Sequence, residues 1–283
     1  MTEEEYRNEW LKGLYHTDYN NCRFADDKEK YAIDWIKKFM PNINLENPQN
    51  IVDRIAYNKI YDMNPLKPLW ADKIKALELV KERNMSETII PPIFTKYCEK
   101  FTLEDYNTIP NGKWIFKCNH GSGWNIKFEK KDNSNPTYLI EKLNEWLSLN
   151  YAFISGWEWH YDKIPHGVIV QPDLGELLDW QFWCENGEIK GIQLSKKLGK
   201  NLEEYQVWCD ENGEKTDWVI GIMPMQRTLS PSRKVMLEKI KPYVKELAQG
   251  FKFVRVDFYY KDGQPLFGEM TFTPCSGCLK LLY

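Results

Sequence analysis

Apolar side chains in the first third of the chain recur every three or four residues, which is the spacing of a helix that buries one face. The pattern predicts helices over Glu5 to Leu14, Lys28 to Phe39 and Leu69 to Arg83. Asn84 follows the last of these and suits a helix end, because asparagine tolerates the left-handed backbone found there. The first 90 residues are therefore expected to be mostly helical.

Short apolar runs typical of strands replace this spacing from about residue 91 onward. Strands are predicted at Lys113 to Cys118, Trp124 to Phe128 and Gly167 to Gln171, and a helix with one apolar side is predicted at Tyr138 to Leu149. This part of the chain is expected to mix strands with helices.

The last part of the chain carries three dipeptides that favour β-hairpins, Asn186-Gly187, Asn212-Gly213 and Asp262-Gly263. A helix is predicted between the second and third, from Pro231 to Gln249, with Ser230 as its N-cap and Gly250 at its end. A helical third, a mixed section and a run of hairpins together indicate an α+β fold in two or three lobes.

Composition and charge exclude several functions. The 283 residues carry 38 Lys and Arg against 41 Asp and Glu, so the basic excess of a duplex-DNA-binding protein is missing and no nucleic-acid partner is expected. The acidic N-terminus lacks the apolar core of a signal peptide, and no apolar stretch approaches the roughly 18 residues of a membrane span. Seven cysteines are then expected to be reduced, cytoplasmic thiols. The single Cys275-x-x-Cys278 motif lacks the second pair of a structural zinc site.

A loop with two glycines is the first candidate for chemistry. It follows an apolar run that ends with Lys117, and it reads Asn119-His120-Gly121-Ser122-Gly123. Glycines allow backbone N–H groups to face an anion, and a half-buried lysine needs an anionic partner. The residues alone fit either a phosphate-binding loop or a simple hairpin with a glycine turn.

Acidic residues on two predicted strands are the second candidate. Alternation over Phe253 to Tyr259 places Arg255 and Asp257 on one face, and the return strand adds Glu269 and Thr271. Two carboxylates with a hydroxyl form an oxygen-rich site that suits Mg²⁺, although an exposed hairpin face with an Arg–Glu pair has the same pattern. The density of apolar neighbours favours the metal site. Three apolar residues are expected to face the core: Val254, Val256 and Phe258.

The two carboxylates can share a metal ion only if they lie on the same face of the hairpin. A two-residue turn at Asp262-Gly263 would set Asp257 opposite Gly268, and Glu269 would point away. A three-residue loop, Asp262-Gly263-Gln264, would set Asp257 opposite Glu269. We therefore expect the longer loop, another odd-length loop, or a bulge that restores the same register. Phosphoryl transfer from a nucleoside triphosphate needs groups that bind phosphate and acids that bind a metal ion. The lysine and glycine residues suit the first role, and the two carboxylates suit the second.

The motifs that carry these residues resemble the TupA-like (teichuronopeptide-biosynthesis) ATP-grasp family. They are Asp72-Lys73, the run from Lys117 to Gly123, Arg255 to Tyr259 and Phe267 to Phe272, and the resemblance extends from about Asn47 to the C-terminus. It implies an ATP-grasp fold, in which two α+β lobes clasp ATP, here with a helical N-terminal region. The expected bounds are residues 1–70 for that region, 71–166 for the small lobe with the glycine loop, and 167–283 for the large lobe with the Mg²⁺ site.

The resemblance also implies roles for individual residues. The expected ATP contacts are Lys73, Lys117, Gly121, Ser122, Gly123, Gln171, Asp173 and Leu174. His120, which lies beside the glycine loop in the sequence, is expected either to contact the phosphates as well or to cap the turn. The expected Mg²⁺ ligands are Asp257, Glu269 and Thr271, and Arg255 together with Lys117 is expected to act on the transferring phosphoryl group. Gln171 and Gln181 depart from the family, which usually has Glu and often has Lys at these positions. The stretch Glu158 to Tyr161 is similar to a Glu-x-x-Tyr element of the family, which implies that it faces the acceptor, whereas from the residues alone it is an aromatic packing patch. From the residues alone, His166 is expected at the surface.

These roles imply a cytoplasmic, ATP- and Mg²⁺-dependent carboxylate–amine ligase that acts through an acyl-phosphate. Members of the family are associated with bacterial cell-wall or capsular polysaccharide synthesis, so the expected carboxylate is a uronic acid, on a small molecule or glycan, and the partner is an amine. A sugar phosphotransferase shares the same ATP site and is the first alternative. A carbohydrate-binding protein is the second, although it has no use for the set of Lys117, Arg255, Asp257 and Glu269.

Overall fold

The computed structural model describes residues 19–154, 156–198, 203–216 and 225–279. The chain folds into two compact units. The central unit comprises Pro65–Tyr151 and His160–Gly175, and the C-terminal unit comprises the described residues within 19–64, 152–159 and 176–279. The helix predicted over residues 5–14 lies outside the described residues.

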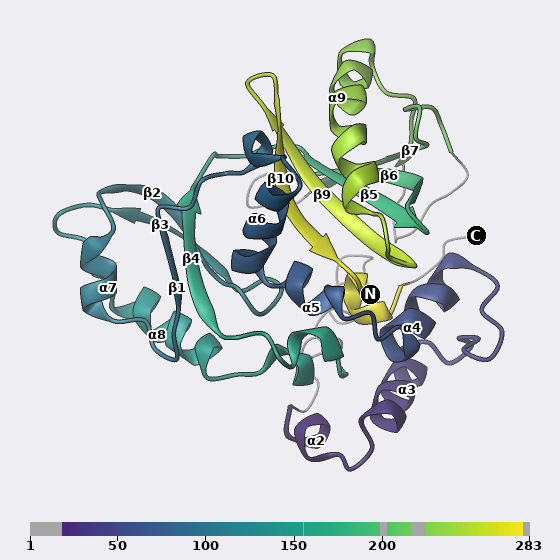
Figure 1. The fold of residues 1–283 in the computed structure, drawn as a ribbon, viewed down its shortest axis with the longest axis horizontal. Coiled ribbons are helices and arrows are strands. Elements are labelled where there is room, and N and C mark those ends of the chain that lie inside the picture. Colours follow the sequence, from purple (N-terminus) through teal and green to yellow (C-terminus); the bar gives the residue numbers. More distant parts are fainter. Residues whose placement is uncertain (1–18, 155, 199–202, 217–224, 280–283) are drawn as a thin grey trace. The chain divides into compact units, whose positions relative to one another are not determined.

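The central unit is built on a four-stranded antiparallel sheet in the order β1-β4-β2-β3 (Figure 1). Its strands are β1 (Phe94–Tyr97), β2 (Gly112–Cys118), β3 (Asn125–Lys130) and β4 (Gly167–Pro172). Its helices are α5 (Leu66–Ala71), α6 (Lys73–Glu82), α7 (Leu103–Thr108) and α8 (Thr137–Leu147), and a 3₁₀ turn, η1, spans Ser86–Thr88. The predicted strands and the helix after residue 137 are thereby confirmed.

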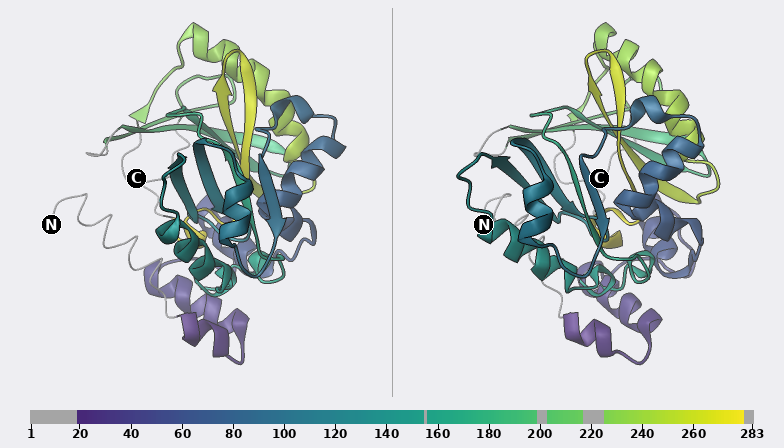
Figure 2. Two further views of the ribbon diagram at one scale, coloured as in Figure 1. Left: turned by 90° about the vertical axis from the view of Figure 1, so that its left-hand side faces the viewer. Right: turned by 60° about the vertical axis from the view of Figure 1, so that its left-hand side comes forward.

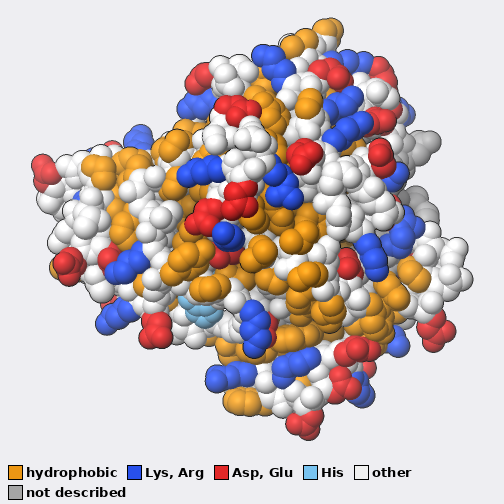
Figure 3. Space-filling model, in the orientation of Figure 1, with side chains coloured by type: hydrophobic (Ala, Val, Ile, Leu, Met, Phe, Trp, Pro, Cys, Tyr) orange, Lys and Arg blue, Asp and Glu red, His pale blue; other side chains and the backbone are white. Residues whose placement is uncertain are grey.

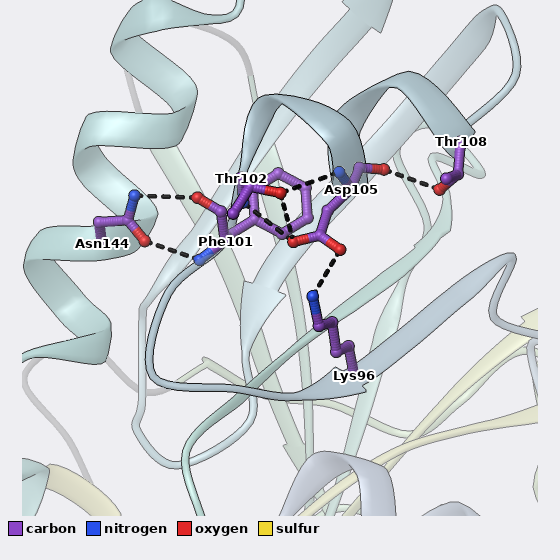
Figure 4. A network of polar contacts seen from close by, with 6 residues as sticks. All are labelled: Lys96, Phe101, Thr102, Asp105, Thr108 and Asn144. Carbon is purple, nitrogen blue, oxygen red and sulfur yellow. Dashed lines mark hydrogen bonds and ion pairs between the residues drawn. The ribbon is translucent and has the colours of Figure 1, made fainter.

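Helices α7 and α8 cover one face of this sheet, as the two views of Figure 2 show. Apolar residues from both helices and from β2 and β4 form the core there, including Tyr106, Leu139, Phe116 and Val168. Polar contacts fix α7 in place (Figure 4). Its N-cap Thr102 forms a capping box with Asp105, which also binds Lys96 of β1 at 2.7 Å. The side chain of Asn144 in α8 accepts a hydrogen bond from the backbone N–H of Phe101 and donates one to the backbone carbonyl of Phe101.

The helix predicted from Leu69 to Arg83 is two helices, because Asp72 interrupts it. The Asp72 backbone is extended, and its side chain accepts hydrogen bonds from the N–H groups of Ile74 and Lys75. This residue therefore ends α5 and caps α6. Asn84 has a positive φ of 57° after α6, which confirms the predicted helix end.

The C-terminal unit holds a six-stranded sheet in the order β10-β9-β5-β6-β7-β8 (Figure 1). Its strands are β5 (Asp179–Glu185), β6 (Glu188–Leu198), β7 (Glu203–Cys209), β8 (Met225–Gln226), β9 (Phe253–Lys261) and β10 (Gln264–Thr271). Its helices are α2 (Tyr19–Phe24), α3 (Lys28–Phe39), α4 (Ile51–Tyr61) and α9 (Pro231–Leu247). Three 3₁₀ turns complete the elements: η2 (Tyr151–Phe153), η3 (Trp159–Tyr161) and η4 (Pro274–Gly277).

The hairpins predicted at Asn186-Gly187 and Asp262-Gly263 are confirmed, whereas the one at Asn212-Gly213 is wrong. Strand β7 pairs with β8 in parallel, and a hairpin would require antiparallel pairing. The local reason lies in the turn after β7, where the Asp210 carboxylate accepts the N–H groups of Asn212 and Glu214. These bonds close a compact loop instead of returning the chain along β7.

Helix α9 packs on the apolar face of the six-stranded sheet, and Ser230 caps it as predicted. Val254, Val256 and Phe258 of β9 are each 0% exposed, so their predicted orientation toward the core is confirmed. The opposite face of β9 is therefore left for polar residues. Within the described residues, no helix combines the length and apolarity needed to cross a membrane. Acidic and basic side chains are interspersed on the face drawn in Figure 3, in keeping with the nearly balanced charge.

Candidate active site

The β9–β10 hairpin has a tight turn and a bulge. Lys261 pairs with Gln264, so the turn contains only Asp262 and Gly263, with φ of 51° and 85°. The three-residue loop that we expected is therefore wrong, because Asp-Gly readily adopts the positive φ angles of a two-residue turn.

The register of this hairpin shifts between Phe267 and Glu269, where Gly268 is an extra residue. As a result, Asp257 lies opposite Glu269 and Arg255 lies opposite Thr271. The bulge that we named as an alternative is confirmed. It places all four polar side chains on one face, and directly opposite Cβ atoms in such a sheet are about 4.5–5.5 Å apart.

Arg255 connects the members of this cluster. Its Nε donates to Asp257 Oδ1 at 2.8 Å, and its Nη2 donates to Asp257 Oδ2 at 2.5 Å and to Thr271 Oγ1 at 3.1 Å. The same Nη2 lies 3.6 Å from Glu269 Oε1. The Asp257 side chain is 5% exposed and that of Glu269 is 39% exposed, so one carboxylate is buried and the other is open to solvent.

Strand β5 adds two polar residues to the same face. Gln181 lies opposite Asp257, and Asp179 lies opposite Tyr259. Gln181 Nε2 donates to Asp179 Oδ2 at 2.9 Å. The sequence pattern did not lead us to expect Asp179 as a member of the site. The alternation of polar and buried residues along β5 was a signal, but the pairing of β5 with β9 cannot be read from the sequence locally.

Charge accumulates at this cluster. Burial raises the pKa of Asp257 above its usual range, the ion pair with Arg255 opposes this rise, and the carboxylates of Asp179 and Glu269 add to it. Burial also raises the pKa of Tyr259, as does Asp179. When ionised, three carboxylates and one guanidinium carry a net charge of −2. Excess negative charge on oxygen ligands is the setting in which a divalent cation binds.

Among the residues that the structure describes, no three or more His, Cys, Asp and Glu side chains come together in an arrangement that could hold a metal ion by themselves. Asp257, Glu269 and Thr271 supply two carboxylates and a hydroxyl at this site. That is the donor set expected for Mg²⁺, which usually binds one or two carboxylates and completes its shell with substrate phosphates and water. The residues therefore fit this ion when it arrives with a phosphate ligand.

The glycine loop of the central unit is bound to the start of helix α6. Lys73 Nζ donates to the carbonyl oxygen of Gly121 at 2.5 Å, and the Lys73 N–H donates to that of Asn119 at 3.2 Å. Asn119 Nδ2 donates to Asp72 Oδ1 and to the Pro165 carbonyl, both at 2.8 Å. The structure thus brings Lys73 and the loop together.

Glycine is required at position 121 because the backbone there is close to aromatic rings. A Cβ atom would lie 2.6 Å from the Trp124 ring and 2.9 Å from that of Tyr151. Ser122 and Gly123 are exposed, and Gly123 has a φ of 72°. One end of the loop is therefore fixed and the other is open to solvent.

The ring of His120 lies inside the central unit. It is 0% exposed, its Nδ1 lies 3.1 Å from Asn119 Oδ1, and it stacks on the His166 ring with centroids 3.7 Å apart. Burial and His166 lower the pKa of His120 to about 3, so the ring is neutral. The expectation that His166 is a surface residue is wrong, because it is partly buried against His120 and its Nδ1 bonds to the Leu147 carbonyl.

The remaining expected ATP contacts lie on β2, β4 and the segment after β4. Lys117 Nζ donates to Gln171 Oε1 at 3.0 Å, and Gln171 Nε2 donates to the Ile90 carbonyl at 2.8 Å. Asp173 binds Lys127 at 3.1 Å, and Leu174 is partly exposed. Lys117 and Gln171 are therefore direct neighbours, and the glutamine satisfies the lysine where the family usually has an acid.

Comparison with known proteins supplies a family. A model of the TupA-like ATP-grasp family matches residues 53–281, which is most of the chain. No curated protein sequence matches.

Solved structures resemble the chain only distantly. A D-alanine–D-alanine ligase from Bacillus anthracis is 10% identical, with 88% of this chain and 84% of that chain covered and a TM-score of 0.49. The same enzyme from Helicobacter pylori is 14% identical, with 80% and 62% covered and a TM-score of 0.46. The ATP-grasp ligase PsnB, complexed with a minimal precursor, Mg and ADP, is 13% identical, with 74% and 52% covered and a TM-score of 0.38. Because these scores lie below 0.5, the assignment of the chain rests on the family match.

Proposed function

The chain belongs to the TupA-like ATP-grasp family and is thereby an ATP-dependent carboxylate–amine ligase, and we propose that its carboxylate substrate is a uronic acid of a bacterial cell-surface polysaccharide. The product is an amide, formed through an acyl-phosphate. The proposed place of action is the cytoplasm, where ATP is made and where thiols such as its seven free cysteines stay reduced.

The observation that carries this proposal is the register of β9 and β10. It gathers Arg255, Asp257, Glu269 and Thr271 on one face through a bulge at Gly268. Asp257 and Glu269, with the hydroxyl of Thr271, are the proposed ligands of Mg²⁺. The ion, when bound, would neutralise phosphate charge during transfer.

Arg255 holds Asp257 in place and keeps a fixed positive charge beside Thr271. A preorganised charge of this kind stabilises a phosphoryl group as negative charge develops on it. In the central unit, Lys73 and Lys117 are the proposed partners of the phosphates, with the backbone of Gly121 to Gly123 over them. Gln171, Asp173 and Leu174 are the proposed nucleotide contacts. His120 contributes by holding the loop from inside, because its buried ring bonds to Asn119.

The proposal is tested by incubating the protein with ATP, Mg²⁺ and a panel of uronic acids and amines, such as glucuronate and galacturonate with amino acids and ethanolamine. Release of ADP together with the mass of an amide supports the ligase. Release of ADP with a phosphorylated sugar would instead assign a phosphotransferase. Glu269→Gln is the control, since any turnover that survives it does not use the proposed metal site. An absence of ADP with every pair in the panel counts against a uronic acid substrate.

A further inference from the structure

The C-terminal unit buries two oppositely charged residues outside the cluster around Arg255. Lys59 of helix α4 is 1% exposed and Glu158 is 4% exposed. Glu158 accepts hydrogen bonds from Thr273 Oγ1 and from Ser276 Oγ, the latter at 3.0 Å. Lys59 Nζ donates to the Ser276 carbonyl at 2.9 Å. Both charged groups therefore hold the same short segment of chain.

Burial disfavours the charged form of both Lys59 and Glu158. Burial lowers the pKa of Lys59 and raises that of Glu158, and the charge of each residue opposes the shift in the other. Replacing a buried charged pair with apolar residues of similar volume is often neutral or stabilising. The pair is therefore explained better by the conformation that it specifies than by a gain in stability.

The segment that the pair holds is a left-handed turn. Cys275 has φ 50° and ψ 36°, Ser276 has φ 54° and ψ 30°, and Gly277 has φ 78°. Consecutive left-handed residues that carry a Cβ atom are unfavourable. Such backbone persists where its surroundings over-determine it, and it is concentrated at functional sites.

Glu158 reaches this turn through an unusual path of the chain. The eight residues Ala152–Trp159 leave the central unit and join the C-terminal unit, after which the chain returns to the central unit. The excursion is itself tightly fitted, because a Cβ atom on Gly156 would lie 2.2 Å from the Trp35 ring. Lys59 Nζ lies 4.2 Å from the centre of the same ring. Glu158 and Lys59 thus share one packed environment.

The position of the turn along the chain relates it to the proposed reaction. Strand β10 carries Glu269 and then Thr271, and Thr273 and the turn follow directly. If Glu269 serves the metal ion and Thr271 lies beside the transferring phosphoryl group, the turn lies close to that group, because Pro274 follows Thr271 by three residues, which span at most about 10 Å. In an in-line transfer the acceptor lies beyond the phosphoryl group, opposite the leaving ADP.

We propose that Lys59 and Glu158 are positioning residues that hold the Pro274–Gly277 turn in its left-handed form, and that this turn sets the use of the acceptor carboxylate and not the binding of Mg-ATP. This inference rests on the proposed function for the identity of the acceptor. The tethering of the turn by the pair is independent of it.

Three variants test the pair: Lys59→Met, Glu158→Gln and the double variant Lys59→Met/Glu158→Gln. The double variant leaves no single buried charge and keeps the test valid if a single variant folds poorly. The matched control is Arg54→Met on the same helix, whose side chain bonds to Glu185 at 2.7 and 2.9 Å and to the Gln49 carbonyl at 3.0 Å. It reports what any loss of a charged contact of α4 does to activity.

For the carboxylate that the panel identifies, the Glu158→Gln and double variants should lose at least tenfold in kcat/KM. The Kd for Mg-ATP and the slow hydrolysis of ATP by water should stay within twofold of wild type. Arg54→Met should keep all three quantities within twofold. Equal losses in carboxylate use and Mg-ATP binding, or no loss in either, would overturn the proposal.

Hydrogen exchange measures the tethering without any acceptor. Amides of Cys275 to Leu279 should exchange at least tenfold faster in Glu158→Gln, whereas those of Glu269 to Thr271 should keep their wild-type rates. Unchanged exchange at the turn rejects the positioning pair. A wild-type protein that uses no carboxylate of the panel counts against the proposed function, and the exchange result then decides the pair by itself.

Discussion

Replacing Gly268 with alanine tests the geometry on which the metal site depends. A Cβ atom at this position would lie 2.9 Å from the backbone oxygen of Asp257 and 3.3 Å from its carbonyl carbon. The clashing atoms belong to the backbone and cannot rotate away, so β9 and β10 must separate at the bulge. Overpacking of this kind costs about 1–3 kcal/mol. At roughly 2–4 °C per kcal/mol, the melting temperature should fall by about 2–12 °C.

The more telling result concerns the metal. The separation falls between Asp257 and Glu269, and Mg²⁺ demands near-ideal geometry. Gly268→Ala should therefore weaken Mg-ATP binding by at least tenfold, which is about 1.4 kcal/mol. Titration calorimetry would measure the affinity for Mg-ATP, and thermal unfolding with and without Mg-ATP at about 100 times the wild-type Kd so obtained would measure the stability.

Gly263→Ala in the same hairpin is the matched control. Nothing lies within 4 Å of a Cβ atom there, and the only cost is the left-handed backbone with φ 85°, worth about 1–2 kcal/mol. This variant should lose stability yet keep its affinity for Mg-ATP. The reasoning would be refuted by a Gly268→Ala protein that binds Mg-ATP as tightly as the wild type.

Three further predictions concern single side chains. Lys117→Ala should remove most of the stabilisation by Mg-ATP, which is about 2.7 kcal/mol at 100 times Kd; an unchanged melting shift would contradict the phosphate role. Glu269→Gln, at a side chain 39% exposed, should abolish turnover with little change in melting temperature. Asp257→Asn should also abolish turnover, and it should lower the free energy of unfolding by about 3 kcal/mol or more, because it breaks a buried pair with Arg255. Equal stability of the two variants in urea unfolding would argue against this distinction. Folding lowers the pKa of His120 from near 6.5 to about 3, so between these two pH values the unfolded chain binds a proton that the folded chain excludes. The free energy of unfolding should therefore fall by up to about 1.4 kcal/mol per pH unit as the pH drops from 6.5 to 3. In His120→Gln, urea unfolding should show a shallower dependence of stability on pH, and the same dependence as in the wild type would be the contrary result.

Local pattern was sufficient to predict which faces of β9 and β10 are polar, because side chains alternate strictly along a strand. It was not sufficient for the turn. The tight turn follows from the dipeptide Asp262-Gly263, whereas the bulge depends on how Gly268 meets the backbone of the neighbouring strand. The two-residue turn alone would place Asp257 and Glu269 on opposite faces, and the bulge at Gly268 restores them to the same face. Strand alternation could predict that the two carboxylates share a face, but not by which combination of turn and bulge.

Residues contributed by distant segments could not be predicted. Asp179 reaches the site because β5 lies next to β9, and the order of strands in a sheet is not written in the periodicity of any one strand. Lys59 reads in the sequence as an ordinary helical lysine, and its burial depends on packing with a turn more than 200 residues later. The break between α5 and α6 at Asp72 could in contrast be predicted locally, because an Asp directly before a helical run is a typical N-cap.

The division of the chain also constrains the order in which the protein can fold during synthesis. Helix α4 packs against the η4 turn, and Ile51, Val52 and Ile55 share a cluster with Phe253 and Leu279. Translation at about 5–20 residues per second makes these partners only some tens of seconds after the helix emerges. The central unit, in contrast, is complete once Gly175 has been made. Although α3 and α4 can pack on each other early, the face of α4 that carries Ile51, Val52 and Ile55 stays uncovered until nearly the last residues arrive, and in that interval it is a candidate for chaperone binding.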